Sequence, residues 1–263
     1  MNALLVMVRR EFWEHRALWI APLAVAALLL VGAVFGGMHL DRGIHAPGLT
    51  FGPVPATFVA RSAFAFMMML AMVSGLAVIA YLLDSLYAER KDRSILFWKS
   101  LPVSDARTVL VKFAVGMLVV PLGVFLVEVV THLIATGILS LRGSGNGFGP
   151  GLAGAWLGAQ ASVLATTVVA ILWYAPVAAY LMLASVYARR APLVVAALPP
   201  LILTTFEQLL FDTRYVSGFL GRRLGARVHF ADVWTSPELW LGLVAAAGML
   251  YIVVRLRRYR DDT

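Results

Sequence analysis

The chain has 263 residues, of which 61% are hydrophobic and 14% are charged, and its formal net charge is +8. A soluble globular domain typically has about 25% charged residues, so this composition excludes an ordinary soluble protein. Because the sequence contains no cysteine, a disulfide framework and a cysteine nucleophile are excluded as well.

An amphipathic helix at the membrane surface is expected to begin the chain. At 100° per residue, Leu4, Val8 and Phe12 fall on one side of such a helix, and Arg10 and Glu14 fall on the other. The twin arginines at positions 9 and 10 are also typical of an export signal. However, the following apolar run is longer than the ~7–15 residues of a signal peptide, and no small-residue cleavage site follows it. A plain extension of the first membrane span is the alternative.

Six apolar stretches are expected to cross the membrane, because a spanning helix needs about 20 mostly apolar residues. They are residues 17–37, 62–83, 113–134, 160–187, 191–206 and 239–254. The last two are shorter than the usual span, and a glycine-rich loop is expected at residues 143–154, before the fourth. The predicted fold is therefore an all-α integral membrane protein with six transmembrane helices, forming a single domain over residues 1–263.

The positions of Lys and Arg predict the orientation of the chain. Six spans place both termini on one side of the membrane, and fifteen of the 22 basic residues fall on that side, against seven on the other. Cytoplasmic loops are enriched in basic residues, so both termini are predicted to be cytoplasmic. Topology and anionic membrane lipid then explain the positive charge, and nucleic acid is not an expected partner.

Sequence motifs argue against catalysis by this chain. No Gly-Lys dipeptide is present for a nucleotide-binding P-loop, and neither H-E-x-x-H nor G-x-S-x-G occurs. A dinucleotide-type glycine pattern at residues 149–154 follows no strand and is interpreted as a flexible linker. His39, Asp41 and His45 are interpreted as solvated side chains of an outer loop. We expect no enzyme activity, no metal site and no bound cofactor.

Two ionisable side chains lie inside the predicted third span. Glu128 and His132 are one helical turn apart and so share a face, and ionisable groups in a span usually face the helix bundle or water. We predict that both line a translocation pathway. The alternative is a carboxylate near the outer membrane surface that reaches outward, because Glu128 lies about 24 Å along the helix from Lys112.

The predicted cytoplasmic loop at residues 84–112 contains a short apolar helix beside charged residues. Asp92 or Ser94 can cap a helix over residues 95–99, and Pro102 ends it. Ser104 with Asp105 begins the next helix. Apolar side chains exposed beside charges indicate a protein partner or the bilayer surface.

This loop resembles the one between the second and third spans of type 2 ATP-binding-cassette (ABC) permeases. The similar features are the acidic-basic turn Glu89-Arg90, a helix at residues 94–98, a Leu-Pro-Val-Ser segment at 101–104 and Lys112 entering the third span. Residues 9–16 are also similar to the N-terminal interfacial helix of this family.

The resemblance implies a bacterial exporter permease in the cytoplasmic (inner) membrane that pairs with a second permease copy or a paralogue. ATP would be bound by a separate ABC ATPase subunit, and a coupling helix at residues 89–99 would dock into that subunit. The implied coupling residues are Glu89, Arg90, Asp92, Arg93, Ser94, Ile95, Leu96 and Trp98. Re-entrant helices of the family would fall within residues 211–224. A non-transporting membrane scaffold or immunity protein that docks a partner through the same loop is the alternative.

Overall fold

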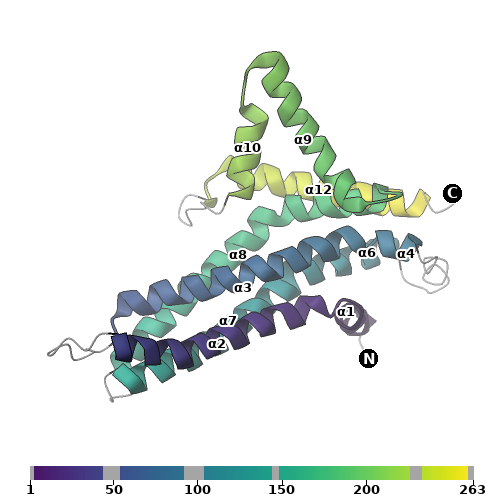
Figure 1. Ribbon diagram of the computed structural model, residues 1–263. Helices are drawn as coiled ribbons and strands as arrows, with labels where there is room; N and C mark the ends of the chain where they lie inside the picture. Colours follow the sequence, from purple (N-terminus) through teal and green to yellow (C-terminus); the bar gives the residue numbers. More distant parts are fainter. Residues whose placement is uncertain (1–2, 44–53, 92–103, 144–147, 226–232, 260–263) are drawn as a thin grey trace. The chain divides into compact units, whose positions relative to one another are not determined.

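The computed structural model describes residues 3–43, 54–91, 104–143, 148–225 and 233–259. Within these ranges every regular element is a helix, as the composition predicted (Figure 1). The elements are α1 (Ala3–Glu14), α2 (Ala17–Gly43), α3 (Ala56–Asp84), α4 (Tyr87–Lys91), α6 (Asp105–Ala114), η1 (Val115–Val119), α7 (Val120–Gly143), α8 (Pro150–Tyr187), α9 (Pro192–Phe211), α10 (Tyr215–Leu224) and α12 (Pro237–Tyr259).

Six helical segments are long and apolar enough to cross a membrane, which confirms an all-α, multi-pass membrane protein. They are Ala17–Phe35, Ala56–Lys91, Asp105–Arg142, Pro150–Tyr187, Pro192–Phe211 and Pro237–Tyr259. The last two have 20 and 23 residues and are longer than predicted, because the helices continue through charged residues that interrupt the apolar runs.

The loop and linker predicted around residues 143–154 are wrong from Pro150 onward, where α8 begins. Proline is tolerated in the first turn of a helix, because its missing N–H would have no helical partner there.

The third span contains a π-helical segment, η1, between α6 and α7. Pro121, two residues after the end of η1, has no N–H to donate to the preceding turn, so the regular α-helical pattern is interrupted in this region. At Gly116, within η1, a Cβ atom would lie 3.0 Å from Leu82 Cδ2. The absence of a side chain at Gly116 therefore lets η1 approach the end of α3 closely.

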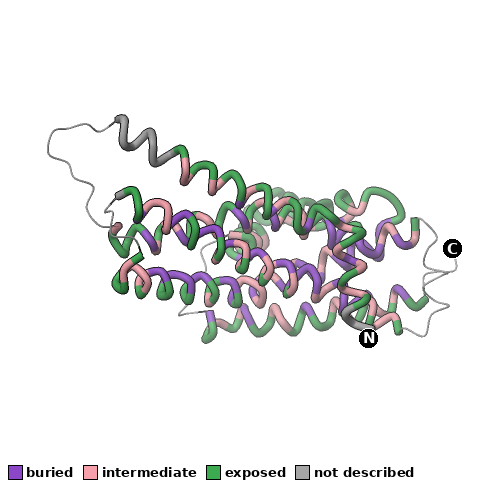
Figure 2. The backbone as a smooth tube through the Cα atoms, turned by 90° about the horizontal axis from the view of Figure 1, so that it is seen from below, coloured by how far each residue is buried: buried purple, intermediate pink, exposed green. Residues whose placement is uncertain are grey.

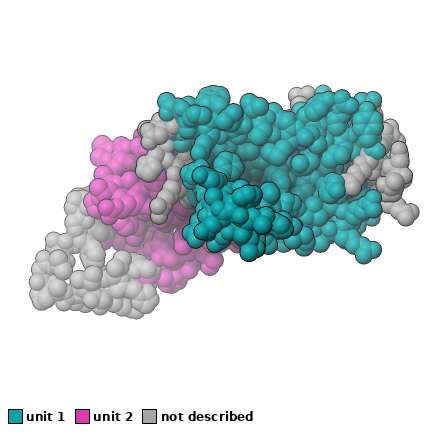
Figure 3. Space-filling model, turned by 90° about the horizontal axis from the view of Figure 1, so that it is seen from above, with its two compact units in different colours: residues 1–15, 78–119, 168–263 teal, residues 16–77, 120–167 magenta. Residues whose placement is uncertain are grey.

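The chain forms two compact units, each built from separate stretches of sequence (Figure 3). Unit 1 contains residues 1–15, 78–119 and 168–263, and unit 2 contains residues 16–77 and 120–167. Helices α3 and α8 contribute residues to both units, so the units are not consecutive domains.

Unit 2 is a helix bundle with an apolar core between α3 and α8. Val59 and Ala63 of α3 pack with Trp156 and Val163 of α8, and Phe125 of α7 covers them. Figure 2 shows buried residues recurring between exposed ones along the helices, as expected when one face of a helix packs and another faces outward.

In unit 1, small residues allow α8 and α12 to pack closely. Ala175 and Ala179 of α8 meet Ala246 of α12, and Phe113 of α6 packs against them. Small side chains at helix contacts let backbones approach, which favours association where there is little hydrophobic driving force between helices.

Candidate functional site

Five charged side chains of unit 1 form a connected set of ion pairs, which we call the charge network. Four of them are buried, and the fifth, Asp105, is partly exposed. The network consists of Glu11 from α1, Glu89 from α4, Asp105 and Lys112 from α6, and Arg257 from α12. Helices α4 and α6 are the elements on either side of residues 92–103 in the sequence, so the network holds both ends of the predicted coupling loop.

Lys112 links three helices of the network. Its Nζ atom lies 2.9 Å from Glu11 Oε1 and 3.2 Å from Glu89 Oε1, and the lysine side chain is only 2% exposed. The Tyr81 hydroxyl donates to Glu11 Oε2 at 3.0 Å, which occupies the second carboxylate oxygen. One ammonium group therefore joins α1, α4 and α6, and Tyr81 adds the end of α3.

Arg257 brings the last helix into the same network. Its Nη1 atom lies 2.9 Å from Glu89 Oε2, and its Nε donates to Asp105 Oδ1 at 3.1 Å. Three carboxylates and two cations give the network a formal charge of −1. Helices near both ends of the chain thus meet at one place in unit 1, an arrangement that fits an even number of spans.

The local sequence explains why α6 presents its charges to the network. Ser104 caps the helix as predicted, because its Oγ accepts from the Arg107 N–H at 3.3 Å. Asp105 in the first turn is favoured by the helix dipole. Lys112 follows seven residues later, which is two helical turns, so both side chains lie on the same face of α6.

A second attachment joins α4 to the end of α8. The Ser185 hydroxyl oxygen accepts from the N–H groups of Leu86 and Tyr87 at 3.2 and 3.1 Å. Arg90 Nη2 donates to the carbonyls of Ser185 and Ala188 at 2.6 and 2.9 Å. The last carbonyls of an α-helix have no partner within the helix, so Arg90 supplies a donor that α8 would otherwise lack.

The predicted coupling residues divide into two groups. Glu89 is 6% exposed, and Arg90 is partly buried and hydrogen-bonded to α8, so in this structure both side chains contact other helices of unit 1. Asp92, Arg93, Ser94, Ile95, Leu96 and Trp98 lie outside the described residues. The coupling role of this segment stays a prediction.

Sequence reasoning overlooked three members of the charge network. Asp105 was interpreted only as a helix start, and Arg257 is one of several arginines after the last apolar run, with no feature to distinguish it. Glu11 did carry a signal, because 100° per residue places it about 20° from Leu4, at the edge of the apolar side of the helix. A carboxylate in that position indicates a buried cation from another element.

A second group of polar side chains lies inside unit 2, and we call it the polar cluster. It joins α3, α7 and α8 and consists of Ser62, Glu128, His132, Thr136 and Gln160. Gln160 Nε2 lies 3.3 Å from Glu128 Oε1 and 3.0 Å from His132 Nδ1. His132 Nε2 lies 3.0 Å from Ser62 Oγ and 3.4 Å from Thr136 Oγ1.

Glu128 and His132 occupy the middle of their helix and not its outer end. The third span continues to Arg142, so Glu128 lies about 24 Å from Lys112 and about 21 Å from Arg142 at 1.5 Å per residue. Their exposed fractions are 0% and 1%. Neither side chain reaches outward in this structure, which argues against the alternative of an exposed carboxylate near the membrane surface. The expectation that both line a pathway stays a prediction.

One group of metal-type ligands occurs in the part of the chain that the structure describes. Ligand atoms of Glu11, Glu14 and His15 lie within 4.8 Å of one another. Lys112 and Arg10 already neutralise the two carboxylates, at 2.9 and 2.5 Å. The negative charges of Glu11 and Glu14 are thus already compensated by side chains of the protein. The side chains of the other ligand types considered from the sequence, His39, Asp41 and His45, lie outside the described residues.

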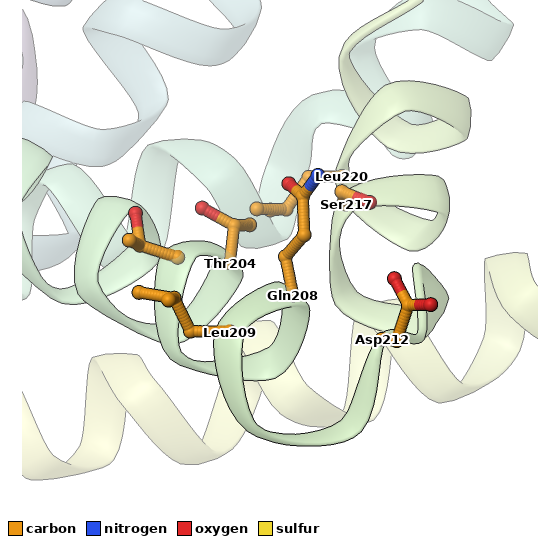
Figure 4. A pocket seen from close by; sticks show the side chains of 7 residues that line it. Thr204, Gln208, Leu209, Asp212, Ser217 and Leu220 are labelled. Atoms are coloured by element: carbon orange, nitrogen blue, oxygen red, sulfur yellow. The ribbon is translucent and has the colours of Figure 1, made fainter.

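An open pocket of about 720 Å³ lies between α9 and α10. Helix α10 falls within residues 211–224, the region in which the resemblance implies re-entrant helices. Figure 4 shows Gln208 of α9 reaching toward Ser217 of α10, with Asp212 at the turn. Glu207 closes this turn, since its Oε1 accepts from the Tyr215 N–H at 2.5 Å and its Oε2 accepts from the Val216 N–H at 2.9 Å.

Comparison with known proteins adds no assignment. No protein-family model, no curated protein and no solved structure matches this chain. Inferences about its function therefore rest on its own residues and contacts.

Proposed function

We propose that this chain is the transmembrane permease subunit of a bacterial ABC exporter. It would work with a separate ATPase subunit and with a second permease copy or a paralogue. The observation that carries the proposal is the charge network, which ties α4 and α6, the helices on either side of residues 92–103 in the sequence, to other helices of unit 1. The resemblance of that loop to the coupling segment of type 2 permeases supports the same function.

A permease driven by a separate ATPase needs a rigid connection between the docking loop and the spans. A loop with flexible ends would absorb a displacement, whereas a loop held at both ends passes it on. Here α4 is fixed to α8 by Ser185 and Arg90, and Lys112 and Arg257 join α4 and α6 to α1 and α12. A push on the loop would therefore act on several helices together.

The energetics of buried charges favour a geometric role for the network over a purely stabilising one. Replacing a buried ion pair with well-packed apolar residues is often neutral or stabilising, so stability alone does not account for four buried charges. Charged groups in membrane proteins are costly and are usually kept for function. A network that holds helices in a fixed arrangement at the base of a docking loop is consistent with that use.

The proposal includes the predicted orientation and pathway. Both termini would be cytoplasmic, in the bacterial inner membrane, as the excess of basic residues on that side favours. Glu128 and His132 would line the pathway only in a state in which α3, α7 and α8 move apart, because both side chains are closed off in the present one.

Recruitment of an ATPase tests the proposal directly. We would purify the tagged chain from its native host, look for a co-purifying P-loop ATPase, and compare the wild type with Trp98→Glu and Trp98→Phe. A charge in the centre of an apolar docking helix should abolish co-purification of the ATPase, whereas the conservative phenylalanine should preserve it. The amount of permease in the membrane is measured for each variant, so that loss of docking is distinguished from loss of protein.

Two outcomes would contradict the proposal. One is that no ATPase co-purifies with the wild-type chain. The other is that Trp98→Glu retains as much ATPase as the wild type. If the ATPase binds but none of the candidate substrates added to the complex changes its rate of ATP hydrolysis, the chain behaves as a membrane scaffold. The export function is then rejected.

A further inference from the structure

The polar cluster contains a buried carboxylate with no cation beside it. Glu128 is 0% exposed, and no Lys or Arg in the described part of the chain lies within ion-pair distance of it. The nearest group able to carry positive charge is His132, whose Nδ1 atom lies 4.0 Å from Glu128 Oε1. The charge of the cluster therefore depends on the protons of these two side chains.

The hydrogen bonds assign a neutral imidazole to His132. The side-chain amide of Gln160 donates from Nε2, so His132 Nδ1, at 3.0 Å, is an acceptor and carries no proton. The ring proton is then on Nε2, which donates to Ser62 Oγ at 3.0 Å. The Ser62 hydroxyl donates in turn to the Phe58 carbonyl at 2.8 Å. Each of these three donors therefore has an acceptor when the ring carries a single proton, so these bonds require no imidazolium.

The carboxyl group of Glu128 is only partly satisfied as an anion. Its Oε1 accepts from Gln160 Nε2 at 3.3 Å, but its Oε2 and the Gln160 Oε1 atom are both buried without a hydrogen-bond partner. An ionised carboxylate that is buried, unpaired and half unsatisfied within a membrane span is strongly disfavoured. A proton on Oε2 removes the negative charge and adds no heavy atom, so the neighbouring side chains need not move to make room for it.

Other titratable groups of unit 2 do not supply the missing charge. The helices that form the cluster contribute only Glu128 and His132 as titratable groups facing it, and residues 17–35 of α2, which packs on α7, contain none. Among the described side chains, Arg16 and Arg61 are exposed, and Arg142 donates to the Val34 carbonyl.

We propose that Glu128 is a proton-binding site, which holds one exchangeable proton on Oε2 in this structure. If the two side chains move closer than the 4.0 Å that now separates Oε1 from Nδ1, the proton can pass to His132 Nδ1, which breaks the O–H bond, forms an N–H bond and leaves a carboxylate beside an imidazolium. Gln160 must then turn its amide so that Oε1 faces the ring in place of Nε2. The cluster holds the same number of protons in both forms, and this inference holds whether or not the chain is a permease.

Infrared difference spectroscopy of the purified full-length protein in lipid vesicles tests the site. The wild type at neutral pH should show the C=O stretch of a buried carboxylic acid, which shifts in D₂O and disappears on alkaline titration. Glu128→Gln, which has nearly the same shape and no charge, should lack this band. Glu14→Gln, at an exposed carboxylate, is the matched control and should retain it.

His132→Gln locates the proton and provides a second test that does not depend on the folding of Glu128→Gln. If Glu128 holds the proton, His132→Gln retains the acid band of the wild type. An acid band that is absent from the wild type and present only in His132→Gln would place the proton on the imidazole and overturn the proposal. An acid band that Glu128→Gln retains would also overturn it, because another carboxyl group would then hold the proton.

Discussion

Removal of the Lys112 ammonium is the sharpest test of the charge network. In Lys112→Met the long apolar side chain is kept, but Glu11 and Glu89 lose the cation they share and face each other as buried carboxylates. Glu11 retains the Tyr81 hydroxyl and Glu89 retains Arg257. The expected result is a large loss of stability without loss of core volume.

The distances give the size of the effect. At an effective dielectric constant of about 20, ion pairs at 2.9 and 3.2 Å each attract by about 5–6 kcal/mol before desolvation is subtracted. Removing one partner of a buried pair costs about 3–5 kcal/mol. Because one ammonium serves two carboxylates here, we expect about 5 kcal/mol, which corresponds to a fall of roughly 10–20 °C in melting temperature for a chain of this size.

The assay is thermal unfolding of the detergent-solubilised protein, followed by tryptophan fluorescence at a fixed heating rate because membrane proteins often unfold irreversibly. Lys91→Met, at an exposed lysine of α4, is the matched control and should change stability by no more than about 0.5 kcal/mol. The double variant Lys112→Met with Glu11→Gln should recover much of the loss, because two carboxylates and one cation restore the wild-type charge of −1. Equal melting of Lys112→Met and Lys91→Met, or no recovery in the double variant, would refute the reasoning.

Three further predictions concern other contacts of unit 1. Ser185→Ala removes the acceptor of two backbone N–H groups at the start of α4 and should lower the free energy of unfolding by about 1–3 kcal/mol, measured by denaturant titration; an unchanged midpoint would contradict this. Gly116→Val should cost about 1–3 kcal/mol because Leu82 must move, whereas Gly123→Val meets open space, so equal losses would show that the close approach at Gly116 is not limiting. Burial lowers the pKa of His15 below its ordinary value, so the folded protein binds a proton at this side chain less readily than the unfolded chain does. The contribution of neutral His15 to the free energy of unfolding is therefore complete above the unfolded pKa of about 6.5. This contribution is lost as the pH falls through the lower pKa of the folded state. Acid unfolding curves of the wild type and His15→Phe measure this, and identical pH dependence would count against it.

The six membrane-spanning helices were predictable because they depend on local composition. Spans are long, and the apolar runs that mark them are longer than most features of a soluble sequence. The errors occur at helix ends, where α8 begins at Pro150 inside the expected loop and α12 extends through its arginines to Tyr259. Backbone hydrogen bonds continue a helix past the point where hydropathy changes, so composition alone does not locate the ends.

The functional contacts were less predictable, because they join residues far apart in the sequence. The positions of Glu128 and His132 on one helical face followed from their spacing, but Gln160 and Ser62 as their partners did not. Likewise the cap at Ser104 is a local feature and was predicted, whereas the pairing of Arg257 with Glu89 joins residues from different spans. Which of several arginines is buried depends on packing that no single segment encodes.

The charge network also constrains the order in which the chain can be assembled. Glu11, Glu89 and Lys112 belong to early segments, but Arg257 lies in the last helix described. During synthesis, Glu89 can pair with Lys112 before α12 is made, but Asp105 gains its cation partner in the network only when Arg257 of α12 is in place. A chain that stalls before α12 therefore lacks both ion pairs of Arg257, with Glu89 and with Asp105, and such an incomplete product is open to recognition and degradation. The ion pairs of Arg257 thus distinguish a finished chain from an unfinished one.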